Sequence, residues 1–191
     1  MKIILVRHCE VDERYKGCYN GYNDIGLSKN GKLQARELAK KLDILEFDAV
    51  FCSDLRRAKE TLKYSLHVKN AVYDERLREK SWGRHEGMNF EEISAEENIR
   101  YTDFLQWIEA LDGEPYKDFI KRVEQFFLEF LASLKKERVL VITHAGIIRI
   151  LISIVKNISL EESFYVEVAD GTLVLFDTKE KSFTKENNEN I

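Results

Sequence analysis

The chain contains little of what marks a secreted or membrane-spanning protein. Among its 191 residues there are three cysteines, one proline and no hydrophobic run of transmembrane length. Three cysteines without C-x-x-C spacing argue against a disulfide framework and a thiolate zinc site. The first apolar run leads straight into Arg7 and is too short for the core of a signal peptide. These absences favour a cytoplasmic protein and disfavour a membrane partner.

The chain also lacks a cluster of basic residues, and its formal net charge is −4. Binding to a nucleic-acid backbone needs lysines and arginines gathered on one face, so we do not expect nucleic acid as a partner. With 44% hydrophobic residues, the chain can fill one core but hardly two. We expect a single domain over 1–191, with a small helical cap inserted at 83–114. The charged, asparagine-rich stretch 179–191 has no periodicity and predicts a flexible tail.

What the sequence does contain is an alternation of apolar strands and amphipathic helices. Strands are predicted near 3–6, 49–52, 71–73 and 139–143, and helices over 29–42, from a cap at Ser53 or Asp54 to Leu66, after Pro115, and after His144. This pattern predicts an α/β fold, a three-layer αβα sandwich with a mostly parallel sheet. Two late strands, 164–168 and 172–176, are expected to form a hairpin through Asp170-Gly171, whose edge could serve a homodimer.

Two of the predicted strands deliver a histidine at their carboxyl ends. His8 follows the first strand and Arg7, and His144 follows the strand 139–143. Ligands of open α/β sheets lie outside the carboxyl ends of the strands. Small residues stand at both junctions, Cys9 in one and Ala145-Gly146 in the other, so backbone N–H groups can approach an anion. Either histidine alone would more often be ordinary, but the shared context predicts a phosphate pocket.

Arg56 and Arg57 stand at the start of a predicted helix, where negative charge is the favoured partner. Cations there make sense if an anionic ligand lies between them and the helix. Adjacent helical residues point about 100° apart, so only one of the two faces the pocket.

The chemistry that these residues suit is phosphoryl transfer. A neutral imidazole such as His8 can attack phosphorus, and water can then hydrolyse the phosphohistidine. Fixed cationic donors, here Arg7, Arg57 and His144, would stabilise the charge on the transferring group. Glu79 follows the third strand and is the candidate that protonates the leaving oxygen and later activates water.

Five segments, in order, resemble the motifs of the histidine phosphatase superfamily, also called the phosphoglycerate mutase-like family. Leu5-Val6-Arg7-His8-Cys9-Glu10 resembles its "RHG" signature, and Gly21-Tyr22-Asn23-Asp24-Ile25-Gly26-Leu27-Ser28 its glycine-to-"LS" segment. Ser53-Asp54-Leu55-Arg56-Arg57-Ala58 resembles its second-arginine motif, and Leu77-Arg78-Glu79 through Gly87 its acid motif. Thr143-His144-Ala145-Gly146-Ile147-Ile148-Arg149 matches its second-histidine motif.

The resemblance implies a phosphatase without metal or cofactor that acts on a small phosphorylated metabolite. It implies a phosphohistidine on His8, Glu79 as proton donor and His144 as a further catalytic residue. The expected substrate-binding residues are Arg7, Arg14, Asn20, Gly21, Arg57 and Ala145. Three positions depart from the usual pattern: Cys9 replaces a glycine, Arg14 an asparagine and Asn20 a serine or threonine. Arg14 could bind the phosphate or a second acidic group.

The short cap favours a phosphatase over a phosphoglycerate mutase. The loop Arg14-Tyr15-Lys16-Gly17-Cys18-Tyr19-Asn20-Gly21 is similar to that of the alpha-ribazole phosphatases of cobalamin assembly. Three alternatives stay open: a broad-specificity phosphatase, mutase-type phosphoryl transfer, and a binding module that holds a phosphorylated ligand without catalysis.

Overall fold

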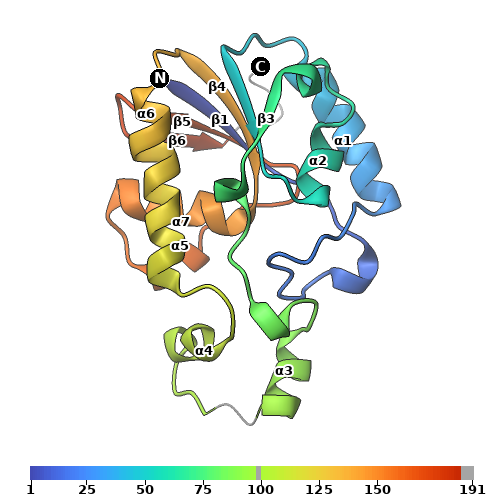
Figure 1. Cartoon of the computed structure of the whole chain (residues 1–191), viewed down its shortest axis with the longest axis vertical. Helices are drawn as coiled ribbons and strands as arrows, with labels where there is room; N and C mark the ends of the chain where they lie inside the picture. The colour runs from blue at the N-terminus through green and yellow to red at the C-terminus, as the bar shows by residue number, and fades with distance from the viewer. Residues whose placement is uncertain (98–99, 186–191) are drawn as a thin grey trace.

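The computed structural model describes residues 1–97 and 100–185, and these form a six-stranded sheet in the order β3-β2-β4-β1-β5-β6 (Figure 1). The strands are β1 (Lys2–Arg7), β2 (Ala49–Cys52), β3 (Ala71–Tyr73), β4 (Arg138–Thr143), β5 (Leu173–Asp177) and β6 (Ser182–Lys185). The first four run parallel, whereas β5 pairs antiparallel with β1 and β6 antiparallel with β5. The mostly parallel sheet is confirmed.

Helices cover both faces of the sheet because its central strands alternate between two cores. Ile3 and Leu5 of β1 face one hydrophobic cluster, and Ile4 and Val6 face the other. The main helices are α1 (Lys29–Leu42) and α2 (Arg56–Leu62) on one face, and α5 (Tyr116–Glu124), a π-helical turn (Gln125–Phe130), α6 (Leu131–Ser133) and α7 (Ala145–Lys156) on the other (Figure 1). This arrangement confirms the three-layer αβα sandwich. None of the helices in the described part of the chain is long and apolar enough to cross a membrane.

The start of α2 differs from the prediction. The helix begins at Arg56 after Leu55, which offers no side-chain cap, and Leu66 lies beyond its end. The two predicted capping residues have other partners: Ser53 Oγ lies 2.8 Å from His144 Nε2, and Asp54 pairs with Arg78. Side chains committed to these contacts near the carboxyl edge of the sheet are no longer free to cap the helix.

The predicted late hairpin is wrong in its first strand. Phe164 ends a helix, α8 (Leu160–Phe164), whose capping box joins Ser159 and Glu162, and residues 165–172 form a loop. The real hairpin joins β5, which matches the predicted strand 172–176, to β6, which lies inside the stretch predicted as a flexible tail. Phe183 of β6 stacks on Phe176 of β5 at 4.5 Å between ring centroids, which gives this stretch an apolar partner. Residues 186–191 of the predicted tail lie outside the described residues.

The segment 83–114 is helical, as predicted, and lies beyond the carboxyl edge of the sheet (Figure 1). It contains α3 (Phe90–Glu97) and α4 (Phe104–Ala110). Its apolar side chains have a small core of their own, formed by Trp82, Ile93, Trp107, Ile108 and Leu111. We call this segment the cap; its insertion into a single domain stays a prediction.

Candidate active site

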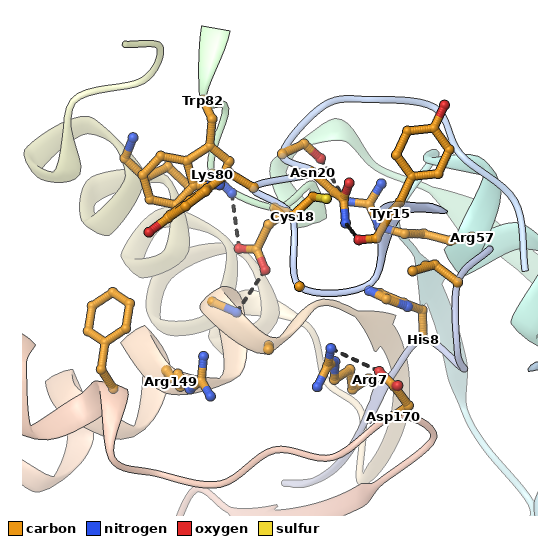
Figure 2. Close-up of a pocket in the computed structure, with 18 of the residues that line it drawn as sticks. Arg7, His8, Tyr15, Cys18, Asn20, Arg57, Lys80, Trp82, Arg149 and Asp170 are labelled. Carbon is orange, nitrogen blue, oxygen red and sulfur yellow. Dashed lines mark hydrogen bonds and ion pairs between the residues drawn. The ribbon is translucent and has the colours of Figure 1, made fainter. Parts of the chain in front are cut away.

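A cavity of about 330 Å³ lies where β1 and β4 end, between the sheet, the loop that follows β1 and the residues just before the cap (Figure 2). Seven of the nine residues predicted from the sequence line it: Arg7, His8, Asn20, Gly21, Arg57, Glu79 and Ala145. The strand-end location expected from the sequence is thus where the structure brings them together.

His8 is held in one orientation by its own neighbour. Its Nδ1 lies 2.8 Å from the carbonyl oxygen of Cys9, which can only accept, so Nδ1 carries the proton and Nε2 keeps its lone pair. Burial, and then the charges of Arg57 and Arg7, lower the pKa of His8 well below its usual value. The ring is therefore neutral at neutral pH, as a nucleophile must be.

Arg57 and His144 form a buried pair behind the cavity. Arg57 Nε donates to His144 Nδ1 at 3.2 Å, while its two amino groups donate to the carbonyl oxygens of Gly21 and Asn23. Because a guanidinium only donates, the proton of neutral His144 sits on Nε2 and is shared with Ser53 Oγ. Burial lowers the pKa of Arg57 to about 10, which leaves it a cation.

His144 itself is fully buried and does not line the cavity. Its ring lies 5.2 Å from that of His8, centroid to centroid. Burial lowers its pKa well below the usual value, and Arg57 adds to that effect. His144 contacts Arg57 and His8, and these two residues line the cavity.

Arg7 is the second guanidinium beside His8. Its terminal amino groups donate to the carbonyl oxygen of Val168 at 2.5 Å and pair with Asp170 at 2.8 Å (Figure 2). Its Nε is buried and has no hydrogen-bond partner among the described residues. An unpartnered buried N–H at this point is available to an anion in the cavity.

Glu79 is fixed by backbone donors. Its Oε2 accepts from the N–H of Gly146 at 2.9 Å and its Oε1 from the N–H of Lys80 at 3.0 Å. A Cβ on Gly146 would collide with Oε1, so the glycine allows the carboxylate to approach α7. The main chain of Glu79 is held in turn by Arg122, which donates to its carbonyl oxygen at 2.9 Å and pairs with Glu114 at 2.7 Å.

The loop after β1 closes the opposite wall. Gly21 has φ of +40°, and a Cβ there would lie 2.6 Å from Glu86 Oε1, so both conformation and space favour glycine. Asn20 donates to the carbonyl oxygen of Tyr15 at 2.8 Å, and its buried Oδ1 has no partner within the described residues. The backbone oxygen of Gly21 accepts from Arg57, which ties this loop to α2.

Arg14 is not brought to the cavity. Its side chain is 77% exposed and pairs with Asp12 beside it. The short 3-10 turn that contains Arg14 is capped by that same aspartate, which turns the guanidinium outward. The geometry therefore gives no support to the predicted contact between Arg14 and substrate.

Sequence reasoning missed the apolar wall and further cations. The wall is formed by Trp82, Tyr116, Phe119, Ile150 and Phe164, and the further cations that line the cavity are Arg149, Lys80 and Lys16. Arg149 stands four residues after Ala145 on α7, so the helical period alone places both on one face. The aromatic wall had no comparable signal, because it depends on how the cap meets α5 and α8.

No set of three histidine, cysteine, aspartate or glutamate side chains gathers as metal ligands within residues 1–97 and 100–185. Cys9 is fully buried, and burial raises its pKa to about 11. The thiol is therefore protonated at neutral pH.

Comparison with known proteins assigns the family. The sequence model described as histidine phosphatase superfamily (branch 1) matches residues 3–190. The chain belongs to the histidine phosphatase superfamily. It is 34% identical over 156 residues to a probable phosphatase of Schizosaccharomyces pombe, covering 79% of this chain and 71% of that one. This histidine phosphatase is accordingly an enzyme, a phosphoric monoester hydrolase.

Two further relatives show the breadth of the family. The crystal structure of the alpha-ribazole phosphatase from Shigella flexneri superposes with a TM-score of 0.84 at 27% identity, over 97% of this chain and 95% of that one. A 2,3-bisphosphoglycerate-dependent phosphoglycerate mutase of Azorhizobium caulinodans is 29% identical over 186 residues, which are 91% of this chain and 90% of the mutase.

Proposed function

We propose that this histidine phosphatase hydrolyses small phosphomonoesters without a metal ion, through a phosphohistidine formed on His8. One observation carries the proposal: Nδ1 of His8 is committed to the Cys9 carbonyl, which leaves Nε2 as the nucleophilic nitrogen beside Arg7, Arg57 and Glu79.

The proposed first step forms a P–N bond and breaks the ester P–O bond. Nε2 of His8 attacks phosphorus, and the leaving oxygen takes a proton from the carboxyl group of Glu79. Arg7 and Arg57 stabilise the charge on the phosphoryl oxygens without reorganising, because backbone carbonyls, Asp170 and His144 already hold them.

The proposed second step restores the enzyme. The Glu79 carboxylate takes a proton from water, whose oxygen attacks phosphorus and breaks the P–N bond. Inorganic phosphate leaves, and His8 is again neutral. Glu79 is available for both proton transfers because Gly146 and Lys80 hold it at the cavity through their N–H groups.

The proposed activity leaves several candidates for the physiological substrate. Alpha-ribazole 5′-phosphate is one candidate, supported by the loop 14–21 and by the likeness to the Shigella flexneri enzyme. A broad-specificity phosphatase is the alternative. Mutase-type transfer is favoured by the Azorhizobium caulinodans relative but disfavoured by the small cap.

The test compares wild type with His8→Ala in the presence of a chelator. Substrates are p-nitrophenyl phosphate, alpha-ribazole 5′-phosphate and a panel of sugar, amino-acid and nucleotide monophosphates. We expect turnover by the wild type alone, with the chelator having no effect. Folded but inactive wild type, with tight phosphate binding, would instead favour a non-catalytic binding module. Formation of 2-phosphoglycerate from 3-phosphoglycerate, in excess over a catalytic amount of added 2,3-bisphosphoglycerate, would establish a mutase.

A further inference from the structure

Arg149 differs from the other partly buried arginines in having no acidic partner, and from the fully buried Arg57, whose terminal amino groups donate to backbone carbonyls. Its Nε donates to the carbonyl oxygen of Val166 at 3.0 Å, and its two terminal amino groups contact no carboxylate within residues 1–97 and 100–185. Four other arginines each pair with a carboxylate at 2.5–2.8 Å: Arg7, Arg76, Arg78 and Arg122. A guanidinium is always charged, so its burial without a counter-ion needs an explanation.

The cavity supplies the place for the missing anion. Arg149 lines it from α7, on the same floor as Arg7 but farther from His8 (Figure 2). The charges that act on His8 are those of Arg57 and Arg7, whereas Arg149 interacts with Glu79, Arg7 and Tyr116. Arg149 therefore stands beside the leaving-group part of the cavity, beyond the clamp around the transferring phosphoryl group.

On the side away from Glu79 and Arg7, the cavity wall near Arg149 is apolar. The centroid of the Phe164 ring lies 5.9 Å from the guanidinium carbon of Arg149. Ile150, Tyr116 and Trp82 also belong to the apolar wall. The ammonium of Lys80, which also lines the cavity, lies 3.9 Å from the centroid of the Trp82 ring. An ion pair formed against such a wall is less screened by water than one at the surface.

We propose that Arg149 selects phosphomonoesters whose leaving group carries a carboxylate. The two free amino groups can bind its two oxygens side by side, and the apolar wall covers the carbon skeleton between carboxylate and phosphate. This role was expected of Arg14 from the sequence, and Arg149 meets the structural requirement instead. The inference rests on the proposed phosphomonoesterase activity, and it ranks acidic esters above alpha-ribazole 5′-phosphate, whose leaving group is neutral.

The test uses matched substrates of two lengths. 4-Carboxyphenyl phosphate is compared with 4-carbamoylphenyl phosphate, and 3-phosphoglycerate with glycerol 3-phosphate. Within each pair only the anion is lost, so the ratio of kcat/KM values isolates its contribution. The enzymes are wild type, Arg149→Met, Arg149→Lys and Arg36→Gln, the last removing an exposed arginine of α1 far from the cavity.

We expect Arg149→Met to lower kcat/KM about 10–100-fold for the acidic member of at least one pair, mainly through KM, and less than about 3-fold for the neutral member. Arg149→Lys keeps a point charge without the fork and should fall between Met and wild type. Arg36→Gln should match wild type on every substrate.

Two results would overturn the inference. An equal loss on acidic and neutral substrates would mean that Arg149 acts on the phosphoryl group or through Glu79. No change on any substrate, with a lowered Tm, would make it structural. Wild type that hydrolyses none of the four substrates, nor p-nitrophenyl phosphate, would instead contradict the proposed function, which separates the two failures.

Discussion

Glu79 depends on the absence of a side chain at its partner, Gly146. The carboxylate accepts from the Gly146 N–H at 2.9 Å, and a Cβ on that residue would occupy the position of Oε1. Gly146 belongs to the first turn of α7, where alanine has the better helix propensity. Substitution of Gly146 by alanine therefore favours the helix but disturbs the position of the Glu79 carboxylate.

Gly146→Ala should lower kcat about 100-fold or more, because it displaces the group that donates and accepts the proton. The Tm should change little, since the helix gains what the site loses. Steady-state kinetics and thermal unfolding measure both effects. In the Glu79→Gln background the same substitution should cost almost nothing further. Wild-type kcat in Gly146→Ala would show that Glu79 is not held through this contact.

The two buried histidines make stability depend on pH in a definite direction. Burial lowers the pKa of both His8 and His144, whereas in the unfolded chain each titrates near about 6.5. Below that pH the unfolded state binds more protons than the folded state. The free energy of unfolding should therefore fall as pH drops, by up to about 1.4 kcal/mol per pH unit for each histidine.

Urea unfolding between pH 7 and pH 5 checks this. His8→Asn removes one of the two groups and should reduce the slope by about half. The carboxylates with lowered pKa values, such as Asp54 and Asp74, lose their stabilising contribution only at lower pH, as they become protonated. An unchanged slope in His8→Asn would mean that His8 is protonated in the folded state.

Among the elements, the carboxyl ends of β1 and β4 and the strand β5 were predicted well from the sequence, and the segment 164–168 was not. A short apolar run ending in a polar residue marks a buried parallel strand, so His8 and His144 were placed correctly. Phe164, Val166 and Val168 alternate as in a strand, although Ser159 and Glu162 carried the signature of a capping box. In this segment the capping box at the start of α8 predicted the structure better than the alternation of apolar residues did.

The β5–β6 hairpin should contribute to stability although β6 lies in the stretch predicted as a flexible tail. Phe183→Ala removes the stack on Phe176 and should lower the free energy of unfolding by about 1–3 kcal/mol. Phe183→Tyr keeps the ring and should be close to neutral. Because β6 lies at the sheet edge away from the cavity, kcat should not change in either variant. A neutral Phe183→Ala would indicate that β6 is not needed by the fold.

At the scale of the molecule, two parts of the fold line the cavity. The sheet and α2 supply the groups around the phosphoryl group, Arg7, His8 and Arg57, all of which the sequence motifs contain. The cap side and α7 supply the wall around the leaving group, including Trp82 and Arg149. Each residue of the first set lies in one short motif, at the end of β1 or the start of α2. The sequence could therefore predict them. In the second set, the helical period of α7 places Arg149, whereas the position of Trp82 depends on how distant helices meet, which no local pattern specifies.

The phosphohistidine on His8 is tested most directly by intact mass during turnover of p-nitrophenyl phosphate. The p-nitrophenolate leaving group needs little protonation by an acid. Glu79→Gln should therefore slow hydrolysis of the phosphohistidine more than it slows formation of the phosphohistidine. We expect Glu79→Gln to accumulate one phosphoryl group, located on His8 by peptide mapping under alkaline conditions, and Glu79→Gln with His8→Asn to carry none. No phosphoenzyme, or one located on another residue, would contradict the account.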